Sequence, residues 1–389
     1  MEQFKAGKYV KAVSPKGERY SAFLPAHMRT DLAWNDPQLP ALLEEARGYL
    51  GELNAYAKLV PNIDFFIESY VAREAEQSNR IEGGTTSLEE VYLEEEDFED
   101  VEKVDDQKEV LNYIRAINEA VASMQTPGRP PLSLRLVYEA HRRLLAGVRG
   151  GDGQHPGRVR TVQNKIGGSR GSLADAVFIP PTPDVVPGLL SDLEKFWHNT
   201  SPEMPTLIKV AYAHSQFETI HPFHDGNGRI GRLIIVLQLM SYGMLQLPVL
   251  YLSDYLEKNR GAYYDALTRV HDSHDLEHWV KFFLIGVRDT AKKGRETLES
   301  IIDLRKSYEE RIEQYLSPRR AALARKLLEP LFKKPVVTAQ EVEKLLSVSK
   351  PTAHAIVDEL VTARILREKT GMKRNRIYTL HEYLALFNR

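Results

Sequence analysis

The sequence predicts a mainly α-helical protein with one β-hairpin in its body and a winged helix-turn-helix domain at its C-terminal end. Apolar residues recur along most of the chain at the three- and four-residue spacings of amphipathic helices. Strand-like segments in the body flank a single glycine-rich turn, and the C-terminal region places helices before a basic hairpin. The 389 residues are 42% hydrophobic and 27% charged, which is ordinary for a globular protein and enough for two or three domains.

Four regions are predicted along the chain. Residues 1–110 form an N-terminal helical region, residues 111–290 a central core, residues 291–317 a helical connector and residues 318–389 the winged helix. Charge supports the last boundary, because residues 318–389 hold 15 lysines and arginines against 7 acidic residues, while the whole chain has a net charge of −2. We therefore expect a basic module attached to an acidic body.

Helices account for most of the body, after an irregular start over residues 1–36. The predicted helices cover residues 40–57, 64–81, 107–123, 132–147, 185–197, 206–220, 230–242 and 261–271, with another from residue 276 onward. Gly83 and Gly84 end the second helix, because glycine readily adopts the left-handed conformation past a helix end. Ser87, with Glu90 three residues later, is expected to cap a further helix.

Two strand-like segments, residues 159–166 and 177–179, flank a turn that is rich in glycine. We expect them to pair as the one clear β-hairpin of the body.

One long apolar run needs an explanation. The segment from Leu233 to Leu252 carries no charge over 20 residues, the nominal length of a membrane span. It contains Gly243 and Pro248, so we expect a buried helix that ends near Gly243 and no association with a membrane. The chain has no cysteine, and its first residues lack the apolar core of a signal peptide, which together predict a cytoplasmic location.

The C-terminal region begins with a charged helix over residues 292–316, which predicts a connector. A helix that Pro330 ends, a helix capped by Thr338 and Glu341, and a helix over residues 350–363 follow. A hairpin over residues 365–378 completes the order of a winged helix. Its basic residues make DNA binding possible, although winged helices also serve as protein-binding modules.

The most informative segment is the run of residues from His221 to Arg232, with the sequence HPFHDGNGRIGR. A glycine-rich turn before a helix can aim several backbone N–H groups at an anion. Arg229 and Arg232 lie three residues apart on one helical face, and guanidinium groups suit phosphate oxygens. Asp225 is a hard oxygen ligand of the kind Mg²⁺ accepts, and His221 is a candidate general base.

These residues match the signature H-P-F-x-[DE]-G-N-G-R-x-x-R at every defined position, so the sequence resembles the Fic family of protein adenylyltransferases. The resemblance implies a Fic-type catalytic core with ATP and Mg²⁺ as its nucleotide and metal. It implies His221 as the catalytic base and Asp225 as the metal ligand. The nucleotide phosphates are then expected to bind at Gly226, Asn227, Gly228, Arg229, Ile230, Gly231 and Arg232.

A second match lies nearer the N-terminus, where residues 78–83 (SNRIEG) resemble the family's inhibitory pattern [ST]-x-x-x-E-[GN]. The resemblance implies that the helix over about residues 64–83 is inhibitory and that Glu82 pairs with Arg232. The pair would take the arginine from the nucleotide. In some relatives the same glutamate orients a water that removes AMP, so both reaction directions are expected.

Weaker resemblances concern the walls of the site. The family's flap, which pairs with target backbone and covers the nucleotide, is matched by Asn164, Lys165, Ile166 and Gly167. Either Tyr263 or Tyr264 would line the adenine pocket. The family also implies a target protein with a serine, threonine or tyrosine hydroxyl, plausible self-modification and a possible homodimer.

Two alternatives remain open at the sequence level. The chain could be a transcriptional regulator that senses nucleotide in its core and binds DNA through residues 318–389. It could also transfer a group from a different phosphate donor, such as UTP.

Overall fold

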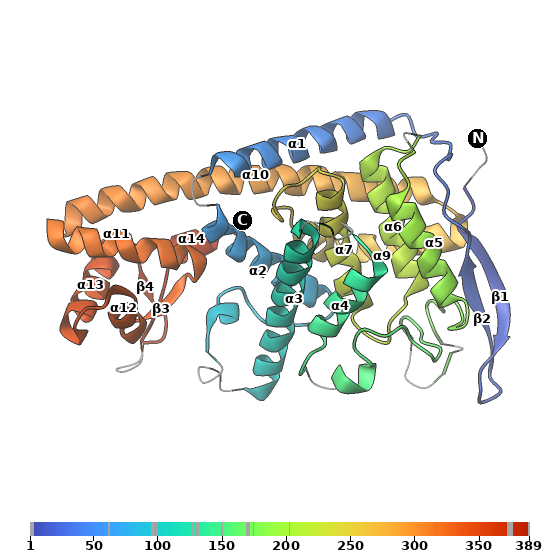
Figure 1. Cartoon of the computed structure of the whole chain (residues 1–389), viewed down its shortest axis with the longest axis horizontal. Coiled ribbons are helices and arrows are strands. Elements are labelled where there is room, and N and C mark those ends of the chain that lie inside the picture. Colours follow the sequence, from blue (N-terminus) through green and yellow to red (C-terminus); the bar gives the residue numbers. More distant parts are fainter. Residues whose placement is uncertain are drawn as a thin grey trace.

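Helices build nearly every layer of the protein, as expected (Figure 1). The structure is a computed structural model that describes residues 4–60, 63–94, 98, 100–126, 128, 132–148, 151–168, 172–173, 175–201, 203–371 and 376–387. At its centre lies α7 (Asn227–Ser241), preceded by α6 (Thr206–Ile220). The helix α7 is apolar around most of its circumference, so it is buried on all sides by its neighbours.

The helices α3 (Val101–Gln125) and α4 (Leu134–Leu144) pack against α7. The body also contains α5 (Val186–His198), which packs on α6, and α8 (Leu252–Lys258) and α9 (Arg260–Ser273), which pack on each other. The apolar run after the motif divides as expected, because α7 ends at Ser241 and Gly243 has a positive φ of 69°. No helix in the described ranges is both long enough and apolar enough to cross a membrane.

The longest helix, α10 (Leu276–Tyr315), has 40 residues and lies along α1 (Leu39–Leu59) (Figure 1). The expected connector is therefore the second half of one continuous helix. Leu298, Ile301, Tyr308 and Ile312 are fully buried along it, spaced so that they form one apolar face. This segment also carries many charged residues on its other faces, so the apolar face was not recognised from the sequence.

The helix α2 (Asp64–Ile81) begins and ends at the predicted residues. Gly83 follows with a φ of 106°, which only glycine adopts without strain. Ser87 and Glu90 do form the expected reciprocal hydrogen bonds, but they cap only the 3₁₀ turn η1 (Glu90–Tyr92). The next helix, α3, starts later, where Asp100 accepts from the backbone of Glu102.

The sheets differ most from expectation. The N-terminal residues, predicted to be irregular, form an antiparallel hairpin of β1 (Gly7–Val13) and β2 (Arg19–Pro25). Most side chains of β1 are exposed, so its sequence lacks the alternation that identifies a half-buried strand. The expected hairpin near residues 159–179 reduces to one antiparallel bridge between Ile166 and Phe178, and part of its turn lies outside the described residues.

The C-terminal region has the element order of a winged helix. It contains α11 (Pro318–Lys333), β3 (Val336–Thr338), α12 (Ala339–Leu346), α13 (Lys350–Thr362), β4 (Arg367–Glu368), β5 (Ile377–Thr379) and a final helix α14 (His381–Leu386) that was not predicted. The strands pair in the order β3-β5-β4, and Thr338 and Glu341 form the predicted capping box.

Pro330 does not end α11, contrary to expectation. It lies in the last turn, and its carbonyl still accepts from Lys334. Leu331 and Phe332 are buried beyond it, so packing holds the final turn in helical conformation despite the missing N–H. The tip of the predicted basic hairpin, residues 372–375, lies outside the described residues.

Candidate active site at the turn between α6 and α7

His221 ends α6 in the left-handed conformation, with φ 48° and ψ 61°. Its backbone N–H donates to Phe217 and its carbonyl accepts from Arg160, so the residue is fixed at both ends. Within the described part of the chain, the imidazole Nδ1 has no hydrogen-bond partner. Burial, assisted by the charge of Arg160, lowers the pKa of His221 from 6.5 to about 4, so the ring is neutral and can accept a proton at pH 7.

The loop after His221 is locked by its own side chains. Asn227 accepts from the backbone N–H of Phe223 at 2.8 Å and donates to the Phe223 carbonyl at 2.9 Å. The Phe223 ring is buried and stacks on His141, whose Nε2 lies 2.9 Å from the Asp225 carbonyl. Gly226 has a positive φ of 76° and starts α7, so the loop delivers the chain directly into a helix N-terminus.

The Asp225 carboxylate is exposed at this loop. More than half of its side chain (56%) is accessible, and Oδ1 accepts from the Gly226 N–H at 2.6 Å. No group of three or more histidine or acidic side chains suited to a metal occurs among the described residues. A single exposed carboxylate suits a hard cation such as Mg²⁺, which keeps waters and takes its other ligands from phosphate.

Arg232 is buried, with 2% of its side chain exposed, and it is held from two directions. Its Nε and Nη2 donate to the hydroxyl and carbonyl oxygens of Ser78, each at 2.9 Å. Nη2 also donates to Glu82 Oε1 at 2.7 Å. Burial lowers the pKa of Arg232, but the Glu82 charge outweighs it and keeps the guanidinium charged.

Glu82 lies over the glycine loop as well as against Arg232. A Cβ added to Gly228 would clash with Glu82 Oε1, so this carboxylate occupies the space directly beside the loop. Burial would raise the pKa of Glu82, but Arg232 holds it below its ordinary value, so the carboxylate is ionised at pH 7. The end of the predicted inhibitory helix and the end of the motif therefore meet through one ion pair.

Arg229 is paired with a residue that the sequence had not indicated. Its Nη1 donates to Glu109 Oε2 of α3 at 2.7 Å, and its Nη2 lies 3.8 Å from Asp225 Oδ2. Ile230 and Gly231 continue the first turn of α7; Ile230 is buried, and the buried Glu218 carboxyl lies against the Cα of Gly231.

The residues of the expected flap lie beside the motif loop. Asn164 donates to the Phe223 carbonyl at 3.0 Å, which brings the two segments together. Ile166 forms the bridge to Phe178, Gly167 packs under Val177, and Lys165 donates to the Ser172 carbonyl.

The two neighbouring tyrosines have different environments. Tyr263 is buried, with 1% exposed, and its hydroxyl lies 2.9 Å from His214 Nε2, so it is a core residue. Tyr264 is 40% exposed and lies near Arg260. Burial and the charge of Glu82 raise the pKa of Tyr264.

Two residues of the site were missed from the sequence. Arg160 is buried and donates to the carbonyls of His221 and Pro181, so it joins the flap segment to the motif. Glu109 belongs to an ordinary charged helix. Neither residue lies in a local pattern, and only the fold brings them to the loop.

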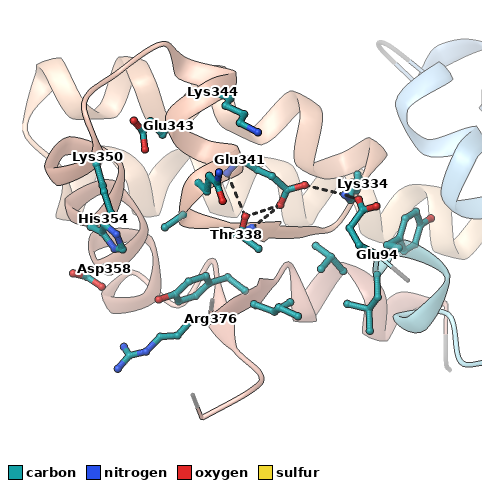
Figure 2. A pocket seen from close by; sticks show the side chains of 17 residues that line it. Glu94, Lys334, Thr338, Glu341, Glu343, Lys344, Lys350, His354, Asp358 and Arg376 are labelled. Atoms are coloured by element: carbon teal, nitrogen blue, oxygen red, sulfur yellow. Dashed lines mark hydrogen bonds and ion pairs between the residues drawn. The ribbon is translucent and has the colours of Figure 1, made fainter. Parts of the chain in front are cut away.

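A groove lies away from this loop, in the C-terminal region (Figure 2). It measures about 990 Å³ and runs between α12, α13 and the segment after η1. Lys344 and Lys350 line it together with Glu343 and Asp358, so its walls carry both signs of charge.

The chain is similar in sequence to known protein families and to individual proteins. The Fic/DOC family N-terminal domain matches residues 41–122, and the Fic/DOC family domain matches residues 131–239. The chain is 32% identical over 206 residues to protein adenylyltransferase Fic of Culex quinquefasciatus, and 28% identical over 207 residues to protein adenylyltransferase fic-1 of Caenorhabditis elegans. Each match covers 52% of this chain but only 37% of the relative, so the chain spans little more than a third of these proteins.

Solved structures share the fold. A Fic family protein from Desulfovibrio desulfuricans aligns over 89% of this chain and 97% of its own, with a TM-score of 0.57 at 22% identity. A fragment of Fic-1 from C. elegans aligns over 68% of this chain and 73% of its own, with a TM-score of 0.50 and the same identity. The matched domains and this shared fold agree with the motif at the α6–α7 turn, and the chain belongs to the Fic/DOC family.

Proposed function

We propose that the chain is a protein adenylyltransferase that moves AMP from ATP onto a serine, threonine or tyrosine hydroxyl of a target protein or of itself. The observation that carries this proposal is a neutral His221 beside a glycine loop that opens a helix, with two arginines on that helix. The curated relatives that match this chain are named protein adenylyltransferases, which supports the same reaction here.

In the proposed reaction, His221 takes the proton of the target hydroxyl. The hydroxyl oxygen then attacks the α-phosphorus of ATP, and the bond to the leaving pyrophosphate breaks. Backbone N–H groups at the start of α7 and the guanidinium groups of Arg229 and Arg232 would hold the phosphates, because such transfer depends mainly on positioning and charge neutralisation. Asp225 would hold Mg²⁺, which supplies further neutralisation of the phosphate charge.

We further propose that Glu82 inhibits this transfer. Arg232 Nη2 has no donor left for a terminal phosphate, because its two N–H groups already donate to the Ser78 carbonyl and to Glu82. The carboxylate also lies against Gly228, so a phosphate bound at the loop would meet a negative charge at close range. The resemblance to relatives in which this glutamate orients a water supports a second proposed activity of the wild-type chain, the removal of AMP from a modified protein.

The test uses ATP labelled at either the α- or the γ-phosphorus. Glu82→Gly should transfer the α-label to protein at least about tenfold faster than wild type, because one charge-assisted contact is worth roughly 1.5–3 kcal/mol. The γ-label should not be transferred, and Glu82→Gly combined with His221→Ala should transfer neither. Glu119→Gly, an exposed change on α3, is the control and should match wild type. Transfer of the γ-label, or equal rates with and without Glu82, would contradict the proposal.

Competition with unlabelled UTP in the same assay identifies the donor. UTP should leave the α-label transfer unchanged if ATP is the donor, and it should suppress the transfer if the site prefers another base.

A further inference from the structure

Arg229 is held by a carboxylate that lies outside both sequence motifs. The Arg229 Nη1 to Glu109 Oε2 distance is 2.7 Å, and only 5% of the arginine side chain is exposed, compared with 29% for Glu109. Arg229 Nε has no hydrogen-bond partner among the residues that the structure describes. Glu109 therefore engages Nη1, while Nη2 lies 3.8 Å from Asp225 Oδ2, beyond hydrogen-bond distance, and can still donate to another group.

Glu109 is on a part of α3 that is firmly attached to the core. Asn112 donates to the carbonyls of Leu144 and Ala146, at 3.2 and 2.7 Å, and Val110 is fully buried. Glu82, in contrast, is the C-cap of α2 and is followed by Gly83. The two carboxylates that hold the motif arginines thus differ in their attachment: Glu109 is on a fixed helix face, and Glu82 is at a helix end.

Formation of the Arg229–Glu109 ion pair removes part of the hydration of both charged groups. Burial raises the pKa of Glu109 in spite of the opposing charge of Arg229. Buried ion pairs add little net stability, because desolvation offsets their attraction. An arginine without this partner would have several rotamers available, whereas a charge-assisted hydrogen bond selects one.

We infer that Glu109 is a positioning residue that fixes Arg229, so that its remaining donors point to the polyphosphate part of the nucleotide. This inference rests on the proposed function and deepens it. The two glutamates act in opposite directions: loss of Glu82 frees Arg232 for a phosphate, whereas loss of Glu109 leaves Arg229 without a fixed orientation. Glu109 therefore favours nucleotides with a diphosphate or triphosphate over a monophosphate.

The test compares Glu82→Gly with Glu82→Gly/Glu109→Gln, using calorimetry with ATP and with AMP, and steady-state AMP transfer. Loss of the glutamate charge should weaken ATP binding about tenfold, because one charge-assisted contact loses its fixed geometry. AMP affinity should stay within about twofold, and KM for ATP should rise more than kcat falls. Glu109→Asp should recover part of the ATP affinity. Glu119→Gln, on the exposed side of the same helix, is the matched control and should change neither value.

Tighter ATP binding in the Glu109→Gln protein would overturn the inference, because it would make Glu109 a second inhibitor. Equal weakening for ATP and AMP would also overturn it, because a purely structural role predicts that result. If the Glu82→Gly parent bound no ATP, the proposed function would fail together with this inference. If the parent binds ATP and Glu109→Gln does not change that affinity, this inference alone would be overturned. If Glu109→Gln does not fold, Glu109→Asp gives a weaker form of the comparison: ATP affinity should fall by less than about tenfold while AMP affinity stays within about twofold.

Discussion

At the loop between α6 and α7, individual side chains determine how Arg232 is oriented and whether its charge is paired. Arg232 has two kinds of partner on α2: Ser78, which orients it, and Glu82, which neutralises it. Ser78 and Glu82 lie one helical turn apart, so one face of α2 presents both groups to the arginine. A change to Glu82 therefore leaves Arg232 in place but uncompensated.

The first prediction concerns stability and activity together. Glu82→Gly should lower the free energy of unfolding by about 1–2 kcal/mol, because a buried arginine loses its charged partner, while partial exposure of Glu82 limits the loss. The melting temperature should fall by about 2–4 °C per kcal/mol. Calorimetry without nucleotide measures this change. A variant that is both more stable and more active would show that the ion pair is not what restrains the site.

The second prediction concerns the protonation of His221. The His221 ring should titrate near pH 4 rather than 6.5, because burial and Arg160 disfavour its charged form. Its folded pKa is lowered, so the residue stabilises the fold above pH 6.5 and loses this contribution as the pH falls towards 4. Removal of Glu82 should lower the pKa further, because that carboxylate favours the charged ring.

Nuclear magnetic resonance titration of the His221 ring, assigned with His221→Gln, measures this pKa. A midpoint at the ordinary value would contradict the buried environment of the ring.

The residues of the motif could be predicted because they are neighbours in sequence and their chemistry is local. Glu82 could be placed only through a second short pattern, 139 residues before His221 (221 − 82 = 139). Arg160 and Glu109 could not be predicted, because their contacts depend on how α3 and the flap segment pack. For the two tyrosines the sequence left the choice open, and burial separates them: Tyr263 is core and Tyr264 is exposed.

At the level of elements, α2 connects the loop to the C-terminal region. Its first half packs on α11 and α14: Phe66 lies against Phe332, and Tyr70 against Phe387, with ring centroids 5.3 and 5.0 Å apart. Ser69 also donates to the Phe332 carbonyl. The position of α2, whose C-cap is Glu82, therefore depends in part on the C-terminal region (Figure 1).

The third prediction follows from this packing. Phe332→Ala should cost about 3–5 kcal/mol locally and raise AMP transfer above wild type, because α2 loses an aromatic contact near its start. The control is Leu360→Ala in α13, a fully buried residue of the C-terminal region, which should lower stability without raising transfer. Equal transfer by both variants, measured with α-labelled ATP, would show that α2 is held independently of α11.

Elements whose buried face is marked in the sequence were predicted well, as α2 and α6 show. The failures share a physical cause. The strand β1 has little buried surface, and Pro330 is helical because Phe332 beside it is buried. These outcomes depend on tertiary packing, which overrides local preference.

At the scale of the whole molecule, acidic and basic regions that are distant in sequence form ion pairs with each other. Glu89 pairs with Lys369, and Glu94 lies 3.2 Å from Lys334, so the acidic segment after α2 contacts the basic C-terminal region. The positive charge of residues 318–389 is thus partly neutralised within the chain.

The fourth prediction concerns DNA. We expect residues 318–389 within the full chain to bind duplex DNA weakly, with a Kd of about 10⁻⁴–10⁻⁶ M that rises steeply with salt, because Asp358 and Glu343 line the groove with the lysines (Figure 2). Fluorescence anisotropy over a salt series measures this, with Lys350→Glu as the weakened variant. Nanomolar binding at physiological salt would instead support a transcriptional regulator.

The most direct measurement is a pair of crystal structures with ATP and Mg²⁺, one of wild type and one of Glu82→Gly. In wild type, Arg232 should remain on Ser78 and Glu82, with no phosphate held in line with His221. In Glu82→Gly, the same guanidinium should contact a terminal phosphate, and the α-phosphate should lie beside His221. A wild-type structure in which Arg232 holds the phosphates while Glu82 stays over Gly228 would contradict the competition between carboxylate and nucleotide.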